Sequence, residues 1–307
     1  MKFPCFQTLI ARFVLLLLSA LPVRAQISSK HELAAGLLES CYHFRFSQAD
    51  SLLQVVRKAP SPLSHSETHL LEANLLWWKT ISGQSEKNLK TRFFEALETA
   101  QKHVKKEKAN HLESHLKQLS IQGFRSRMAM LEQSYTSGFF QLNSSLSLFS
   151  KLLGKENENP LLLVYNGLYH YYWARSWDNY FLLRPYLVLY PKGKLDKGIQ
   201  LLEKAAESNM SNIQTEAHYF LMKIWLDEKK PQKALVHAQV LCKKYPQNAV
   251  FQYYQLMSLQ QMGETNRAAE CEKRLLQGLK NTPGISKEQW QHFYHLCQKI
   301  TKNSSSL

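Results

Sequence analysis

The sequence predicts an all-α fold, a solenoid of about six helical pairs with a C-terminal capping helix. The 307 residues contain only 11 glycines and 10 prolines, too few turn formers for a β-sandwich or barrel. Residues 215–248 and 249–281 repeat one pattern, in which the small residues Ala234 and Ala268 stand 34 positions apart. A period of this length is typical of stacked helical hairpins, because each hairpin buries its apolar face against the next.

The N-terminal half is expected to hold earlier, more divergent pairs. Ala49, within the segment 46–53, takes the place that Ala234 has in the first clear copy. Apolar residues at helical spacing then predict helices over about 66–81, 86–106, 110–135 and 141–153.

The middle pair is predicted to be interrupted. Pro160 opens a first helix that runs to about Ala174, and the matching second helix spans 195–205. Gly167 and Gly198 supply the small residues that let these two helices approach closely. After the two clear copies, a last helix over about 286–302 is expected to cap the apolar end of the stack.

Residues 212–280 resemble the tetratricopeptide repeat family closely, and the rest of the chain resembles it loosely. The matching positions are Leu221, Trp225, Ala234 and Pro246 in the first copy and Gly263 and Ala268 in the second. The chain departs from the family pattern at Met222, Leu256, Leu241, Leu275 and Lys280, which leaves the curvature of the solenoid open. The resemblance implies a groove lined by the first helix of each pair, and its partner-binding positions here would be Tyr165, Tyr172, Tyr219, Lys223, Tyr253 and Met257.

An aromatic insert, about 175–193, separates the two helices of the middle pair. Aromatic rings give rigid contact area, and arginine pairs with carboxylates or stacks on rings. The insert and the end of the preceding helix are therefore a second candidate binding site, with Trp173, Trp177, Tyr180, Arg184 and Tyr186. The alternative is that these rings fill the solenoid's own groove.

Residues 1–25 are expected to be a cleavable signal peptide. Lys2 and Arg12 precede the apolar run 13–21, and short residues around Ala25 suit cleavage before Gln26. The mature protein, 26–302 with a disordered tail 303–307, would then be exported, to the periplasm or else secreted, with no transmembrane segment.

The chain is basic, with a formal net charge of +15. Because an exported protein does not meet nucleic acid, this charge suits anionic proteins, cell-wall polymers or the phosphates of a membrane surface, although scattered solvated lysines would account for it equally well. Peripheral contact with a membrane therefore stays open.

Neither catalysis nor a cofactor is predicted. The histidine pairs His65/His69 and His111/His115 stand one helical turn apart, but the glutamate that a zinc protease needs directly after the first histidine is absent, so no metal is expected. Cys41, Cys242, Cys271 and Cys297 lack a framework spacing and are expected to be buried thiols, with Cys271–Cys297 as the favoured pair if a disulfide forms.

The sequence thus predicts a non-enzymatic scaffold or adaptor of the cell envelope that binds a protein or peptide. One alternative is a module that binds a small ligand or glycan through Trp173, Trp177 and Tyr180. Another is a non-catalytic subunit of an envelope enzyme complex.

Overall fold

The computed structural model describes residues 32–58, 63–107, 111–132, 145–282 and 284–304. The signal peptide predicted over residues 1–25 lies outside these residues. Within them, the regular secondary structure is entirely helical, as predicted. Two helices occupy residues 32–42 and 145–152, and the others are α2 (Phe46–Arg57), α3 (His65–Ile81), α4 (Leu89–Val104), α5 (His111–Leu131), α7 (Leu161–Asn179), the short η1 (Phe181–Leu183) and α8 (Arg184–Leu187), α9 (Leu195–Ala206), α10 (Ser211–Asp227), α11 (Pro231–Lys244), α12 (Ala249–Gln261), α13 (Thr265–Asn281) and α14 (Lys287–Ser304).

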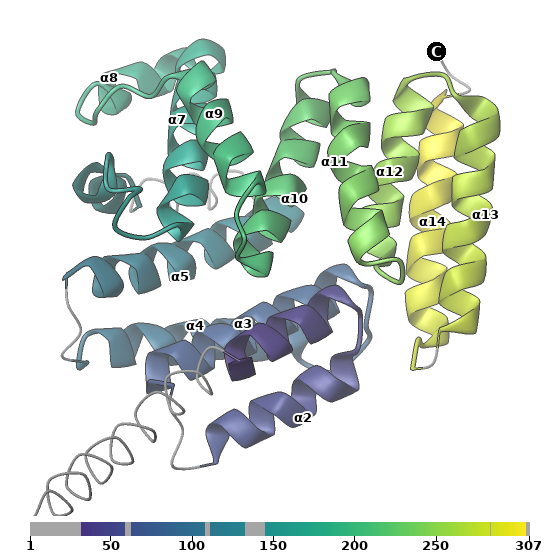
Figure 1. Ribbon diagram of the computed structural model, residues 1–307, viewed down its shortest axis with the longest axis horizontal. Coiled ribbons are helices and arrows are strands. Elements are labelled where there is room, and N and C mark those ends of the chain that lie inside the picture. The colour runs from purple at the N-terminus through teal and green to yellow at the C-terminus, as the bar shows by residue number, and fades with distance from the viewer. Residues whose placement is uncertain (1–31, 59–62, 108–110, 133–144, 283, 305–307) are drawn as a thin grey trace, which may run out of the picture.

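Consecutive helices pack as pairs. The most extensive contacts join α3 with α4, α7 with α9, and α10 with α11, and further contacts join α9 with α10, α11 with α12, and α12 with α13. The last helix, α14, packs on both α12 and α13, where a capping helix was predicted. In Figure 1, α10 to α14 stand side by side, while α2 to α4 run across the lower part of the molecule.

Small residues allow these pairs to approach, as the sequence predicts. Ala49, Ala234 and Ala268 are fully buried. A Cβ atom on Gly198 would lie 2.7 Å from the backbone nitrogen of Tyr171 and 2.8 Å from the carbonyl oxygen of Gly167, so α9 touches the backbone of α7. These contacts support the predicted pairing of the helices on either side of the insert.

Helix starts follow local sequence signals. Ser64 and Glu67 form a capping box at the start of α3. The Asn248 side chain accepts hydrogen bonds from the backbone of Val250 and Phe251 at the start of α12, and Pro231 occupies the first turn of α11.

The two ends of the helical array share one hydrophobic core, which the sequence does not predict. Trp78 of α3 packs against Tyr219 of α10 and Phe251 of α12, with ring centroids 6.3 and 5.7 Å apart. Tyr42 lies 5.4 Å from Trp78, and its carbonyl oxygen accepts a 2.8 Å hydrogen bond from Asn248. In a simple solenoid each repeat contacts only its neighbours, whereas here the N-terminal helices close over the repeats that contain α10 and α12.

Candidate functional site

The insert lies where the sequence places it, between α7 and α9, but it begins later. Helix α7 continues to Asn179, and the insert comprises η1, α8 and the loop up to Lys194. The predicted boundary at about 175 is therefore wrong by one helical turn, because the aromatic segment 169–177 continues the helix.

The aromatic residues of this region divide into an inner and an outer group. Trp173 is buried and stacks on the half-buried Trp177, with ring centroids 5.3 Å apart and planes 6° from parallel. The Arg184 guanidinium lies 5.4 Å from the Trp177 ring, and its Nε donates a 2.9 Å hydrogen bond to the Trp177 carbonyl oxygen. Tyr186 is half-buried, whereas Tyr180 is exposed. Trp173 is thus part of the core, and the prediction that it offers a binding surface is wrong.

The six first-helix residues predicted as a groove also divide. Tyr219 is buried because Trp78 covers it, so it is a core residue rather than a groove residue. Tyr253 packs on the C-terminal core, where burial raises its pKa. Tyr165 donates to or accepts from the Ser120 hydroxyl at 2.6 Å and so joins α7 to α5.

Tyr165 and Tyr253 are nevertheless half-buried, as are the remaining three, Tyr172, Lys223 and Met257, on α7, α10 and α12. The sequence does not predict Tyr254, which packs against the same core cluster as Tyr172 and Met257. Its ring centroid is 6.0 Å from that of Tyr219, and the charge of Lys223 partly offsets the rise in its pKa that burial causes. We call Tyr172, Lys223, Tyr254 and Met257 the first-helix face.

Burial sets the chemistry of this face. Burial raises the pKa of Tyr172. The charge of Lys223 lowers this pKa and that of Asp227 raises it, each with a smaller effect than burial. Burial likewise raises the pKa of Tyr254. Both phenols therefore stay protonated at neutral pH, where they can donate and accept hydrogen bonds but have little nucleophilic character. The face combines neutral phenols, a cation and a flexible thioether, which suits binding.

Arg127 of α5 supports the first-helix face from a neighbouring helix. Its Nη2 lies 2.6 Å from Glu216 of α10, and its guanidinium lies 4.8 Å from the Phe220 ring. Burial opposes the charge of Arg127, but Glu216 raises its pKa above the ordinary value. Tyr42 also donates to Glu216, at 3.5 Å. The Arg127–Glu216 pair fixes α5 against α10, and the Tyr42 hydrogen bond joins the N-terminal helix to the same carboxylate. Arg127 and Glu216 are 89 residues apart, which explains why the sequence pattern does not reveal their contact.

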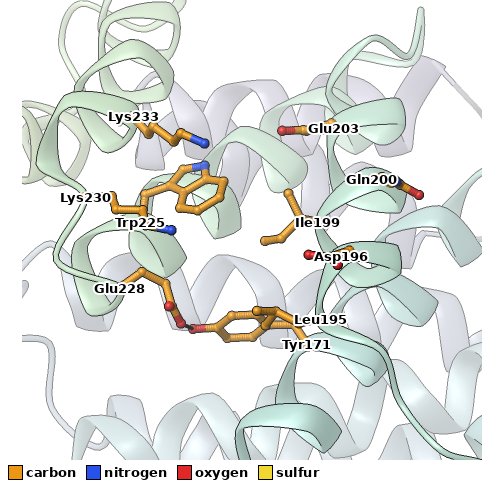
Figure 2. A pocket seen from close by; sticks show the side chains of 10 residues that line it. All are labelled: Tyr171, Leu195, Asp196, Ile199, Gln200, Glu203, Trp225, Glu228, Lys230 and Lys233. Carbon is orange, nitrogen blue, oxygen red and sulfur yellow. Dashed lines mark hydrogen bonds between the residues drawn. The ribbon is translucent and has the colours of Figure 1, made fainter.

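A pocket of about 350 Å³ lies between α9 and the junction of α10 and α11. Figure 2 shows Asp196, Ile199 and Glu203 on one wall and Trp225 with Lys230 and Lys233 on the other. The Lys233 ammonium lies 4.4 Å from the Trp225 ring centroid. We call this the Trp225 pocket.

The floor of the Trp225 pocket is a network of charged residues. Arg175 forms an ion pair and two hydrogen bonds with Glu228, and Tyr171 donates a 2.7 Å hydrogen bond to the same carboxylate. Burial opposes ionisation of Glu228, but Arg175 and Tyr171 hold its pKa below the ordinary value. The network fixes the end of α7 to the end of α10 and shapes the pocket from beneath.

Among the described residues, the histidines and cysteines form no metal-binding site. His65 stacks on His103 with centroids 4.9 Å apart, and His111 lies 6.4 Å from His115, but the described chain contains no group of three or more side chains placed to hold a metal. None of the four described cysteines is in a disulfide, so the bridge favoured between Cys271 and Cys297 is not formed. Burial raises the pKa of both Cys242 and Cys297 to about 12.

Comparison of this chain with protein-family models, curated proteins and solved structures finds no match. Among the helices of the described residues, none combines the length and the apolar character needed to cross a membrane.

Proposed function

We propose that this protein is a tetratricopeptide-like helical scaffold that binds a protein or peptide partner and has no catalytic activity of its own. The observation that carries the proposal is the first-helix face, which gathers partly exposed aromatic, cationic and thioether groups from three helices. Tyrosine and methionine, two of the residue types of this face, are enriched in the cores of protein interfaces. The Arg127–Glu216 pair fixes α10, the central helix of this face, against α5, which reduces the ordering cost of binding.

A charge reversal tests this proposal. Lys223→Glu combined with Met257→Ala changes two half-buried side chains of the first-helix face. We expect the amount of partner that co-purifies with the protein from its native cells to fall at least about tenfold, since side chains central to an interface contribute about 1 kcal/mol or more each.

The matched control is Val236→Ala with Val240→Ala, two exposed residues of α11, the second helix of its pair. The control should retain the partner. Equal recovery of the same stoichiometric partner by both double variants would contradict the proposal, provided that both melt within a few degrees of the wild type.

A small-ligand function is a second candidate, and the Trp225 pocket favours it. Its volume of about 350 Å³ lies at the lower end of the range of small-molecule sites. The pocket lies apart from the predicted site, because none of Trp173, Trp177 and Tyr180 lines it. Lys233→Glu, a change at an exposed residue of the pocket wall, should abolish binding of such a ligand, detected as a ligand-induced rise in melting temperature, while leaving partner co-purification unchanged.

We also propose that the protein is exported after cleavage before Gln26, to the periplasm or to the medium. The apolar run 13–21 with its basic flank and the short residues around Ala25 support this proposal. N-terminal sequencing of native protein should find Gln26 or a close neighbour first, and a retained Met1 would contradict it.

A further inference from the structure

The outer end of the insert exposes five large apolar side chains within ten residues. Tyr180 is 60% exposed, Phe181 72%, Leu182 83%, Val188 61% and Leu189 72%. We call these five residues the insert tip. Figure 1 shows α8 at the corner of the molecule away from α12 to α14, outside the α7–α9 pair. A compact cluster of exposed apolar groups is costly in water unless something covers it.

The base of the insert is packed, so the exposed tip is not a frayed loop. Leu187 is buried between the two halves of the tip in sequence. The Tyr169 hydroxyl donates a 2.6 Å hydrogen bond to the carbonyl oxygen of Pro191, and Gly193 fits closely against Trp173. Together with the Arg184–Trp177 contact, these interactions present the apolar side chains on a fixed support.

The charge within the insert is of one sign. The 17 residues from Asn179 to Leu195 contain Arg184, Lys192 and Lys194 but no aspartate or glutamate. Lys192 and Lys194 are exposed, and the exposed Asp178 and Asp196 lie just outside this segment at either end. Exposed aromatic and aliphatic side chains bordered by lysines match the surface of an anionic bilayer. There the apolar side chains enter the boundary between headgroups and acyl chains, and the ammonium groups bind lipid phosphates.

We propose that the insert tip inserts into the headgroup region of an anionic phospholipid bilayer, with Lys192 and Lys194 binding lipid phosphates. A bilayer suits this surface better than a protein does, because the tip is widely exposed at a corner of the molecule, whereas the anchors of protein interfaces are concentrated in well-packed pockets. The inference concerns a different surface from the first-helix face and does not depend on partner binding there.

Vesicle flotation of the full chain tests the inference. Wild-type protein should float with vesicles of phosphatidylglycerol and phosphatidylcholine and bind phosphatidylcholine alone far more weakly. Phe181→Ser, Leu182→Ser and Leu189→Ser together should weaken binding at least about tenfold, because each removes a large apolar side chain from the lipid. Lys192→Gln with Lys194→Gln should weaken binding to anionic vesicles by about fivefold per lysine at low salt.

The matched control is Val55→Ser, Val236→Ser and Val240→Ser, which removes three exposed apolar side chains from α2 and α11. It should float like the wild type. Wild-type protein that does not float, or a tip variant that floats like the control, would overturn the inference.

A local probe distinguishes the tip from the apolar N-terminal run, which could bind lipid by itself. Leu182→Trp adds a fluorophore at the tip, and Val236→Trp adds one on α11. Brominated lipids should quench the added fluorescence only of Leu182→Trp. If neither is quenched, and sedimentation shows a wild-type dimer that the tip variant converts to monomer, the tip binds a second copy of the chain and the bilayer inference is wrong.

Discussion

At the residue scale, Ala268 and its neighbour Ala269 provide a direct test of the repeat pattern. Ala268 is fully buried in the C-terminal core, while Ala269 is exposed on the same helix. Ala268→Leu should therefore lower the free energy of unfolding by about 1–3 kcal/mol through overpacking. Ala269→Leu should change it by less than about 0.5 kcal/mol. Urea denaturation of both variants measures the difference, and equal effects would contradict the assigned register.

Two helical glycines should respond to alanine with opposite signs. Gly198 has no room for a methyl group, since its Cβ would lie 2.7 Å from the backbone nitrogen of Tyr171. Gly198→Ala should destabilise the protein by about 1–3 kcal/mol, because α9 must move away from α7. Gly278 of α13 has nothing within 4 Å of that position, so Gly278→Ala should stabilise by about 0.5–1 kcal/mol. Thermal denaturation showing the same sign for both would contradict the α7–α9 contact.

At the element scale, a histidine pair joins the two helices of one repeat. The Nδ1 atoms of His218 in α10 and His237 in α11 lie 2.9 Å apart. Burial, with a smaller contribution from His218, lowers the pKa of His237 to about 4. In the unfolded chain this histidine has a pKa near 6.5, so as the pH falls it is protonated at a higher pH than in the folded protein. The stability contributed by neutral His237 is thus present above about pH 6.5 and is lost as the pH falls toward 4.

His237→Gln should therefore reduce the acid sensitivity of the fold. Between about pH 7 and 5, the wild type should lose roughly 1–2 kcal/mol more of its free energy of unfolding than the variant loses. Histidines other than His218 contribute equally in both proteins, so the comparison reports on the His218–His237 pair. Identical pH dependence by urea denaturation would show that the pair does not couple α10 to α11.

The aromatic insert shows how far sequence periodicity reaches at this scale. The spacing between Pro160 and Gly198 reveals an interruption of the repeat, and the glycine contact agrees with that pairing. The spacing does not show that Trp173 is buried and Tyr180 exposed, because both residues are aromatic. The difference follows from where α7 ends: Trp173 lies within the helix, whereas Tyr180 comes directly after its last residue, Asn179. Apolar composition predicts burial as readily as binding, so the exposed Phe181 and Leu182 carry no distinct signal in the sequence.

At the scale of the whole molecule, Trp78 connects helices that are far apart in the chain. It is buried and contacts the rings of Tyr42, Tyr219 and Phe251. Trp78→Ala should lower the free energy of unfolding by about 3–5 kcal/mol, as truncation of a buried aromatic residue does. Hydrogen exchange should then show lost protection both in helix 32–42 and in α12. Loss confined to α3 and α4 would contradict closure between the two ends.

Local patterns therefore predict the helices and their pairing but not this closure. Ala234 and Ala268 mark their helices through a fixed period, which depends on neighbours in sequence. Trp78 and Phe251, or Arg127 and Glu216, meet across long separations that no period encodes. The first-helix face is for this reason smaller than the resemblance implies: Tyr219 lies under Trp78, while Tyr172, Lys223 and Met257 keep part of their surface.

The central claim, that partners bind on the first-helix face, is tested most directly by site-specific photo-cross-linking in native cells. A benzophenone amino acid at Met257 places the reactive group on this face, and the same group at Val236 places it on the exposed side of α11. We predict that Met257 yields one discrete cross-linked protein, identified by mass spectrometry, which is absent with Val236. No adduct at Met257, or the same adducts at both positions, would contradict the proposed binding face.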